Sequence, residues 1–217
     1  MDNIIFYGLL TFLLSKLNNQ IIKYGFKNPY YLIHFIVNFI IVYMTYPAVL
    51  LLYTDFHNSY QYKININSIW LCMSLHVYHM IHYRKTIGFQ DYLHHIPTIF
   101  LLGYPTLRGN FDNAVVGHIV FYLSGLPGGI DYLMLFCVRN KMMNVMTEKF
   151  VNKYLNLYIR CPGAIISFIF LIIYYQKYEI ELFYSISFIS IYIFLNGVYY
   201  MERVTTDYSY NKILNII

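Results

Sequence analysis

Long apolar stretches that recur along the whole chain are the feature that most restricts how this sequence can fold. They lie at 4–17, 30–53, 66–82, 91–106, 114–138, 164–175 and 180–200. Several approach the ~20 residues that a helix needs to cross a hydrocarbon core about 30 Å thick. Inside lipid every backbone N–H and C=O must be paired within the segment, and these runs lack the two-residue alternation of barrel strands. The sequence therefore predicts an all-α, polytopic membrane protein with a bundle or barrel of about seven transmembrane helices.

The composition agrees with lipid as the main solvent. The chain is 59% hydrophobic and 12% charged, with a mean hydropathy of +0.48, which is too apolar for a soluble domain of 217 residues. We expect one transmembrane domain over 1–217. Asp2, rather than a basic residue, precedes the first stretch, and no small-residue cleavage site follows it, so we interpret 4–17 as an anchor instead of a signal peptide. If it only lies at the interface, six spans remain.

Basic residues are distributed unevenly between the two sets of predicted loops. Twelve of the 15 lie in the 1–2, 3–4 and 5–6 loops and the C-terminus, and three lie in the other set. The positive-inside rule then predicts an N-terminus outside and a C-terminus in the cytosol. We further expect the endoplasmic reticulum or a related endomembrane, in which the outside is the lumen. Because this asymmetry accounts for the net charge of +5, we expect membrane lipids as partners and no nucleic acid. A homodimer is left open.

The largest hydrophilic insert is 139–160, where apolar and aromatic residues recur at helical spacing with lysines between them. We expect an amphipathic helix on the cytosolic surface, with its lysines near anionic head groups. A plain connecting loop is the alternative. The apolar residues are Met142, Met143, Met146, Phe150, Tyr154 and Tyr158, and the lysines are Lys141, Lys149 and Lys153.

Polar side chains that a lipid-facing helix should not carry gather at one depth of the predicted bundle. An ionisable group near the bilayer centre costs several kcal/mol unless it is paired or hydrated. Asp91, His94, His95 and Thr98 share one helical face at i, i+3, i+4 and i+7. Counting inward at about 1.5 Å per residue places groups from four other helices at the same level. They are His34, Asn38, His76, His79, His82, Asp131 and Asn196.

Together these groups predict a hydrated pocket open to the cytosolic leaflet. Two imidazoles beside a carboxylate can hold one ring in a fixed tautomer, so that it acts as a base or nucleophile. Simple interhelical hydrogen bonding is the alternative for each residue taken alone. Pro97 and the segment 125–129 are expected either to kink their helices beside a cavity or to allow close helix packing. His57 and His118 are interpreted as interfacial or structural.

The stretch His94-His95-Ile96-Pro97-Thr98-Ile99-Phe100-Leu101 resembles the HHxxTxxL motif of the TLC domain family, whose members include the ceramide synthases. Ile130-Asp131-Tyr132-Leu133 resembles their Asp-x-x-Leu segment, and the resemblance covers about 30–203. It implies acyl transfer from acyl-CoA to a sphingoid amine. His94 and His95 would be nucleophile or base, and Asp131 an orienting or acid group. His34, Asn38, His76, His79, Asp91, Thr98 and Asn196 would line the substrate site.

The resemblance implies no bound cofactor, with acyl-CoA as co-substrate. Its phosphates would meet a set of cytosolic cations, namely Arg84, Lys85, Arg139 and Lys141. The family's His-Asp pair is missing, because 121–127 has the sequence Phe-Tyr-Leu-Ser-Gly-Leu-Pro. A non-catalytic TLC-like protein that binds, senses or transports lipids is therefore the second hypothesis.

A membrane di-iron hydroxylase or desaturase is the third hypothesis, since such sites need many histidines facing one cavity. The HxxHH boxes are absent, because Asp91 stands where the leading histidine should be. The three cysteines also lack a metal-binding spacing, so no metal ligand is predicted.

Overall fold

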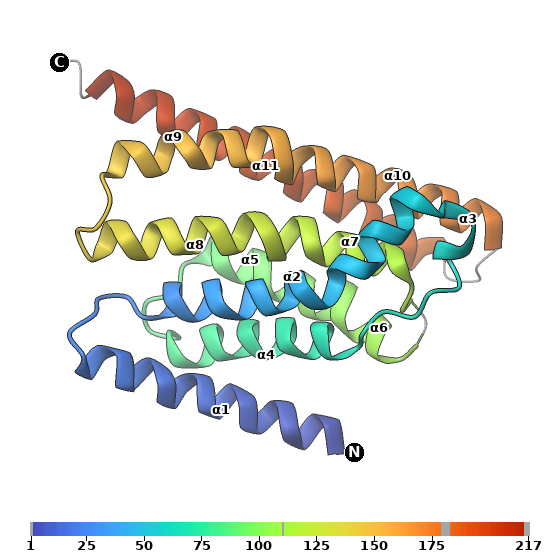
Figure 1. Ribbon diagram of the computed structural model, residues 1–217, viewed down its shortest axis with the longest axis horizontal. Coiled ribbons are helices and arrows are strands. Elements are labelled where there is room, and N and C mark those ends of the chain that lie inside the picture. The colour runs from blue at the N-terminus through green and yellow to red at the C-terminus, as the bar shows by residue number, and fades with distance from the viewer. Residues whose placement is uncertain (1, 110, 179–182, 215–217) are drawn as a thin grey trace.

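The structure is a computed structural model that describes residues 2–109, 111–178 and 183–214, and these residues form a bundle of long helices without a strand (Figure 1). Four rods are uninterrupted α-helices: α1 (Asp2–Lys23), α2 (Tyr30–Thr54), α4 (Asn67–His82) and α11 (Phe183–Leu214). A single helical turn, α3 (Phe56–Ser59), follows α2. The prediction of an all-helical fold is confirmed for this part of the chain.

Three further rods each contain one wide, π-helical segment. They are α5 (Phe89–Pro97), η1 (Thr98–Gly103) and α6 (Tyr104–Leu107); α7 (Ala114–Val120), η2 (Phe121–Gly125) and α8 (Leu126–Arg139); and α9 (Val145–Leu155), η3 (Asn156–Arg160) and α10 (Cys161–Tyr178). Such segments are rare and frequently occur at functional sites. Here η1 begins directly after Pro97, whose ring removes one backbone donor from the ladder.

Successive rods run in opposite directions, so the connections fall into two groups at opposite ends of the bundle (Figure 1). The connections 24–29, 83–88 and 140–144 and the C-terminal end of α11 lie at one end, which we call the polar end. The connections 55–66 and 108–113 lie at the other end with the start of α1. This grouping is the one that the sequence predicted for its two loop sets.

Three helical segments of the described residues are long and apolar enough to cross a membrane: Tyr30–Thr54, Ala114–Arg139 and Val145–Tyr174. They identify a membrane protein, as the composition predicted. The other predicted spans do not meet this criterion of length and composition. The α4 helix, for example, has 16 residues, fewer than the ~20 of a typical span.

Small residues allow the central helices to approach closely. A Cβ added to Gly117 would lie 2.5 Å from the Ala48 Cβ, and one added to Gly129 would lie 2.8 Å from the Phe39 ring. Contacts this short are sterically forbidden, so glycine is required where α7 and α8 pack on α2. Of the two alternatives for 125–129, the structure supports close helix packing, with the π-helical η2 ending at Gly125.

The segment 139–160 differs from its predicted surface helix. The α9 helix continues through η3 into α10 as one rod, and its polar side chains face inward while its apolar ones face outward. Glu148 and Asn156 are buried, whereas Phe150 and Tyr158 are exposed. A helix with its apolar face outside suits lipid around it, and a helix lying on the membrane surface would turn its charged side to water.

Candidate functional site

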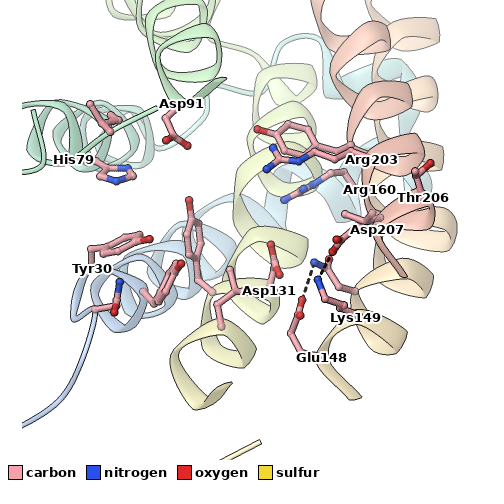
Figure 2. Close-up of a pocket in the computed structure, with 18 of the residues that line it drawn as sticks. Tyr30, His79, Asp91, Asp131, Glu148, Lys149, Arg160, Arg203, Thr206 and Asp207 are labelled. Carbon is pink, nitrogen blue, oxygen red and sulfur yellow. Dashed lines mark hydrogen bonds and ion pairs between the residues drawn. The ribbon is translucent and has the colours of Figure 1, made fainter. Parts of the chain in front are cut away.

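A basin of about 1060 Å³ opens at the polar end of the bundle (Figure 2). Side chains from α2, α4, α5, α8, α9, η3 and α11 line it, so the basin depends on the whole bundle. It contains three of the predicted site residues, His79, Asp91 and Asp131. Its other charged lining residues are Glu148, Lys149, Arg160, Glu202, Arg203 and Asp207.

Arg160 reaches the basin at the end of a buried ladder of polar side chains spaced four residues apart. Glu148 Oε1 accepts from Asn152 Nδ2 at 3.2 Å, and Asn156 Nδ2 donates to Asn152 Oδ1 at 2.7 Å. Arg160 Nη1 then donates to Asn156 Oδ1 at 3.1 Å. Positions four apart stay on nearly one helical face, so the ladder orients the guanidinium toward the bundle.

The guanidinium of Arg160 has no carboxylate partner within 4.0 Å among the described residues. Arg160 is 7% exposed, its Nε has no hydrogen-bond partner there, and its Cζ lies 4.9 Å from the centroid of the Tyr200 ring. Lys149, in contrast, is paired with Asp207 (Figure 2). A buried arginine is normally paired, so an unpaired one beside a cavity marks a place where an anion can bind.

Asp131 of α8 lines the basin together with Arg160 and Arg203 (Figure 2). Its Oδ1 is buried and has no hydrogen-bond partner among the described residues. Acid and guanidinium groups thus line the same volume without contacting each other. A ligand with both donors and anionic oxygens would satisfy the two groups.

Three imidazoles form a triangular cluster between α4 and α5, beside the basin. The ring centroids of His76 and His94 are 5.3 Å apart, those of His76 and His95 4.7 Å, and those of His94 and His95 5.3 Å. One nitrogen of each ring is buried and has no hydrogen-bond partner in the described part of the chain: His76 Nε2, His94 Nδ1 and His95 Nδ1.

Hydrogen bonds from two of the rings fix their orientation. His76 Nδ1 lies 2.7 Å from the carbonyl oxygen of Cys72, so this nitrogen carries the proton and donates. His95 Nε2 lies 3.0 Å from His79 Nδ1. His79 also lines the basin and stacks on Tyr30 with centroids 5.0 Å apart. His79 therefore connects the cluster to the basin.

His94 also lines a narrow apolar cavity. Thr98, Leu101 and Leu102 of η1 contribute to it, as do Leu123 and Ser124 of η2. Its volume of about 10 Å³ is close to the minimum for one water molecule, so its side chains must rotate to admit a larger group. Two π-helical segments thus meet next to the cluster.

The structure gives Asp91 and Thr98 local roles in their helix. Asp91 Oδ2 accepts from the Gly88 N–H at 3.0 Å and so caps the start of α5, while the same side chain lines the basin. Thr98 Oγ1 donates to the His94 carbonyl oxygen at 2.7 Å and lies 3.2 Å from the Tyr192 hydroxyl. Neither side chain is hydrogen-bonded to an imidazole of the cluster.

The remaining predicted residues lie around the site without entering the basin. His34 Nδ1 donates to the Tyr30 carbonyl oxygen at 2.7 Å, and its ring lies 5.1 Å from that of His79. Asn38 is buried, and a Cβ at Gly128 would lie 3.2 Å from its Nδ2 and 3.6 Å from Arg160 Nη2. Asn196 on α11 is buried, with its Oδ1 unpartnered in the described residues.

Sequence reasoning missed Arg160, and it assigned the phosphate contacts to other cations. Arg84 and Lys85 line a separate, shallower pocket of about 550 Å³ with α1. The missed signal was the spacing of Glu148, Asn152, Asn156 and Arg160, four polar residues on one buried face of the rod.

No family model, no curated protein and no solved structure matches this chain. The resemblance to the TLC domain family therefore rests on the chain's own residues.

Proposed function

We propose that the chain is a TLC-type membrane protein that transfers an acyl group to an amphipathic lipid. One arrangement carries this proposal. His79 lines the polar basin and contacts His95 of the histidine cluster, and His94 of the same cluster lines the apolar cavity. An amphipathic lipid has the same order of a polar head, a reacting bond and an apolar chain. The site would bind such a molecule with its head group at the end of the bundle.

The head group or the donor that occupies the basin would carry anionic oxygens. Arg160 is held in place by Asn156 and has no carboxylate partner among the described residues, and Arg203 faces the same volume. Guanidinium groups bind phosphate and carboxylate oxygens through two parallel N–H donors. These two arginines would take the phosphates of acyl-CoA, in place of the loop cations that the sequence suggested.

The proposed reaction is the transfer of an acyl group from sulfur to nitrogen. The nitrogen of a sphingoid amine attacks the thioester carbonyl carbon of acyl-CoA, the C–N bond forms, and the C–S bond breaks. The amine loses one proton, and the leaving thiolate of CoA gains one. With the reacting centre at His94 and His95, and with Asp131 facing the basin, the amine and the thioester would meet between the head-group site and the apolar cavity.

The membrane orientation is part of the proposal. Most of the basic residues lie in the connections at the polar end or in the parts of the helices next to them, and positive charge favours the cytosolic side. We therefore place the basin toward the cytosol, from which acyl-CoA would arrive, in seven spans of an endomembrane such as the endoplasmic reticulum.

The test is acyl transfer from a long-chain acyl-CoA to a sphingoid amine by the purified chain in lipid nanodiscs. Replacing a group that moves a proton costs about 10²-fold to 10⁴-fold in rate. We expect that loss in His94→Gln and in His95→Gln. We expect no change in His57→Gln, because His57 is an exposed histidine of α3, at the end of the bundle opposite to the basin. Equal rates in all four proteins, or no product from any of them, would contradict the proposal.

A lipid-binding protein without chemistry is the second candidate. It is favoured by Asp91, whose carboxylate caps α5 and makes no hydrogen bond to an imidazole of the cluster. Such a protein would keep its bound lipid in both histidine variants and form no acyl product in any variant.

A further inference from the structure

We propose that His76, His94 and His95 together bind one divalent transition-metal ion of the Zn²⁺ class. The inference rests on the proposed function and changes the part that the rings play in it: with their free nitrogens on a metal ion, His94 and His95 would hold the ion instead of acting as base or nucleophile. It starts from the convergence of three nitrogen atoms, one from each ring, that lie within 4.8 Å of one another.

The nitrogens without partners are the ones that a metal requires. His76 Nε2, His94 Nδ1 and His95 Nδ1 are buried, and no donor among the described residues reaches them. A buried acceptor without a partner costs about 1–3 kcal/mol, so three such atoms in one cluster are expensive. A single cation that binds all three lone pairs would remove the free-energy cost of all three unsatisfied nitrogens.

The protons of the cluster are already placed for metal binding. His76 Nδ1 donates to the Cys72 carbonyl oxygen at 2.7 Å, which leaves the lone pair on Nε2. If His95 Nε2 donates to His79 Nδ1 at 3.0 Å, the His95 lone pair is on Nδ1. Metal-bound histidines almost always donate their second nitrogen to a neighbouring acceptor in this way.

To bind one ion, the three nitrogens, which lie within 4.8 Å of one another, must move closer together. Nitrogen ligands of tetrahedral Zn²⁺, at about 2.0–2.1 Å from the ion, lie about 3.3 Å apart. The side chains of His94 and His95 leave α5 in different directions, and the His76 ring is near both of them, 4.7 Å from His95 and 5.3 Å from His94. His94 is the least buried of the three side chains and therefore has the most freedom to move toward ligand spacing.

The protein supplies three ligands and leaves the fourth position open. Cys72 does not belong to this group of ligand atoms: its sulfur lies 3.8 Å from His76 Nδ1, whereas the proposed ligand atom of His76 is Nε2. Three protein ligands with an open position are the pattern of catalytic zinc, in which the fourth ligand is water or substrate. A substrate oxygen bound there would lie between the basin and the apolar cavity.

The test measures metal in the purified full chain, carrying an affinity tag without histidine. After chelation and reloading with Zn²⁺, we expect one equivalent of zinc in the wild type and in His57→Gln, and at least about 100-fold weaker binding in His76→Gln. Wild type without zinc, or equal zinc in His76→Gln, would overturn the inference.

Cobalt gives a second readout that does not depend on the stability of a variant. Co²⁺ in a four-coordinate site absorbs strongly in the visible range, and the wild type should show this spectrum. A weak six-coordinate spectrum would overturn the inference. Displacement of Co²⁺ by an equal concentration of Mg²⁺ would also overturn it. Metal binding without acyl transfer would contradict only the proposed function, and acyl transfer in a chain that binds neither metal would contradict only the metal site.

Discussion

His118 and the cluster of His76, His94 and His95 show two ways in which this bundle buries histidine. His118 is completely buried on α7, and both of its nitrogens are used. Nδ1 lies 2.7 Å from Ser167 Oγ, whose own proton goes to the Gly163 carbonyl oxygen at 2.8 Å. His118 Nδ1 therefore donates, and its Nε2 accepts from the Tyr53 hydroxyl at 2.9 Å.

In the cluster, His76 and His95 are buried and His94 is half-buried, and one nitrogen of each ring has no hydrogen-bond partner among the described residues. His118 thus has the environment of a structural histidine, which is one of the two roles that the sequence suggested. The cluster has nitrogens that could still bind a ligand. The comparison teaches that burial alone does not separate the two roles. The number of ring nitrogens with a partner does separate them.

Zinc should sharpen this contrast with the largest effect. A ligand that binds only the folded chain at 100 times its Kd stabilises it by about 2.7 kcal/mol. We expect this gain in the wild type and in His118→Leu, and none in His76→Gln. The measurement is thermal unfolding in detergent, followed by reaction of the buried thiols of Cys72 and Cys161 with a fluorogenic reagent. A gain of equal size in His76→Gln would break the comparison.

Replacing His118 should have the next largest effect. His118→Leu keeps the approximate volume, removes the donor to the buried Ser167 Oγ and leaves the Tyr53 hydroxyl without its acceptor. We expect a loss of about 2 kcal/mol in the free energy of unfolding, without a change in zinc content. The same unfolding assay in metal-free buffer measures it, and a loss below about 0.5 kcal/mol would show that His118 is not the structural member of the pair.

The smallest effect is expected for the cluster itself when no metal is present. His76→Leu removes one bond to a backbone oxygen and also removes one unsatisfied buried nitrogen, so the two terms nearly cancel. We expect a change within about 1 kcal/mol in metal-free buffer. A loss larger than that of His118→Leu would mean that the cluster stabilises the fold and is not reserved for a ligand.

The sequence predicts the helical membrane fold and the polar layer because both follow from strong local signals. Long apolar runs allow only helices in lipid, and the spacing of His94, His95 and Thr98 places them at one depth. The sequence also placed His76 and His79 at this level, and the structure separates their roles: His76 belongs to the cluster, and His79 faces the basin.

The role of Asp91 could not be read from that spacing. Its position three residues into α5 makes it a cap for the Gly88 N–H, and the competing local hydrogen bond takes the oxygen that would have reached an imidazole. A face shared in sequence does not decide which of several donors a carboxylate accepts from.

The inward direction of α9 was equally inaccessible to sequence reasoning. An amphipathic pattern is the same whether its polar face meets water or the inside of a bundle, and Lys149 and Lys153 favoured water. Contacts far away in the sequence decide the matter. Arg160 Nη2 approaches Gly128 of α8, close to Asn38 of α2, and only the assembled bundle creates that position.

The most direct test of the central claim, that the polar end is a lipid site anchored by Arg160, is native mass spectrometry of the chain released from its membrane. The account predicts an amphipathic lipid with anionic oxygens on the wild type and on Arg139→Gln, and its loss, by about tenfold or more in occupancy, on Arg160→Gln. A chain that carries no lipid, or an Arg160→Gln variant that carries the same lipid at the same occupancy, would contradict it.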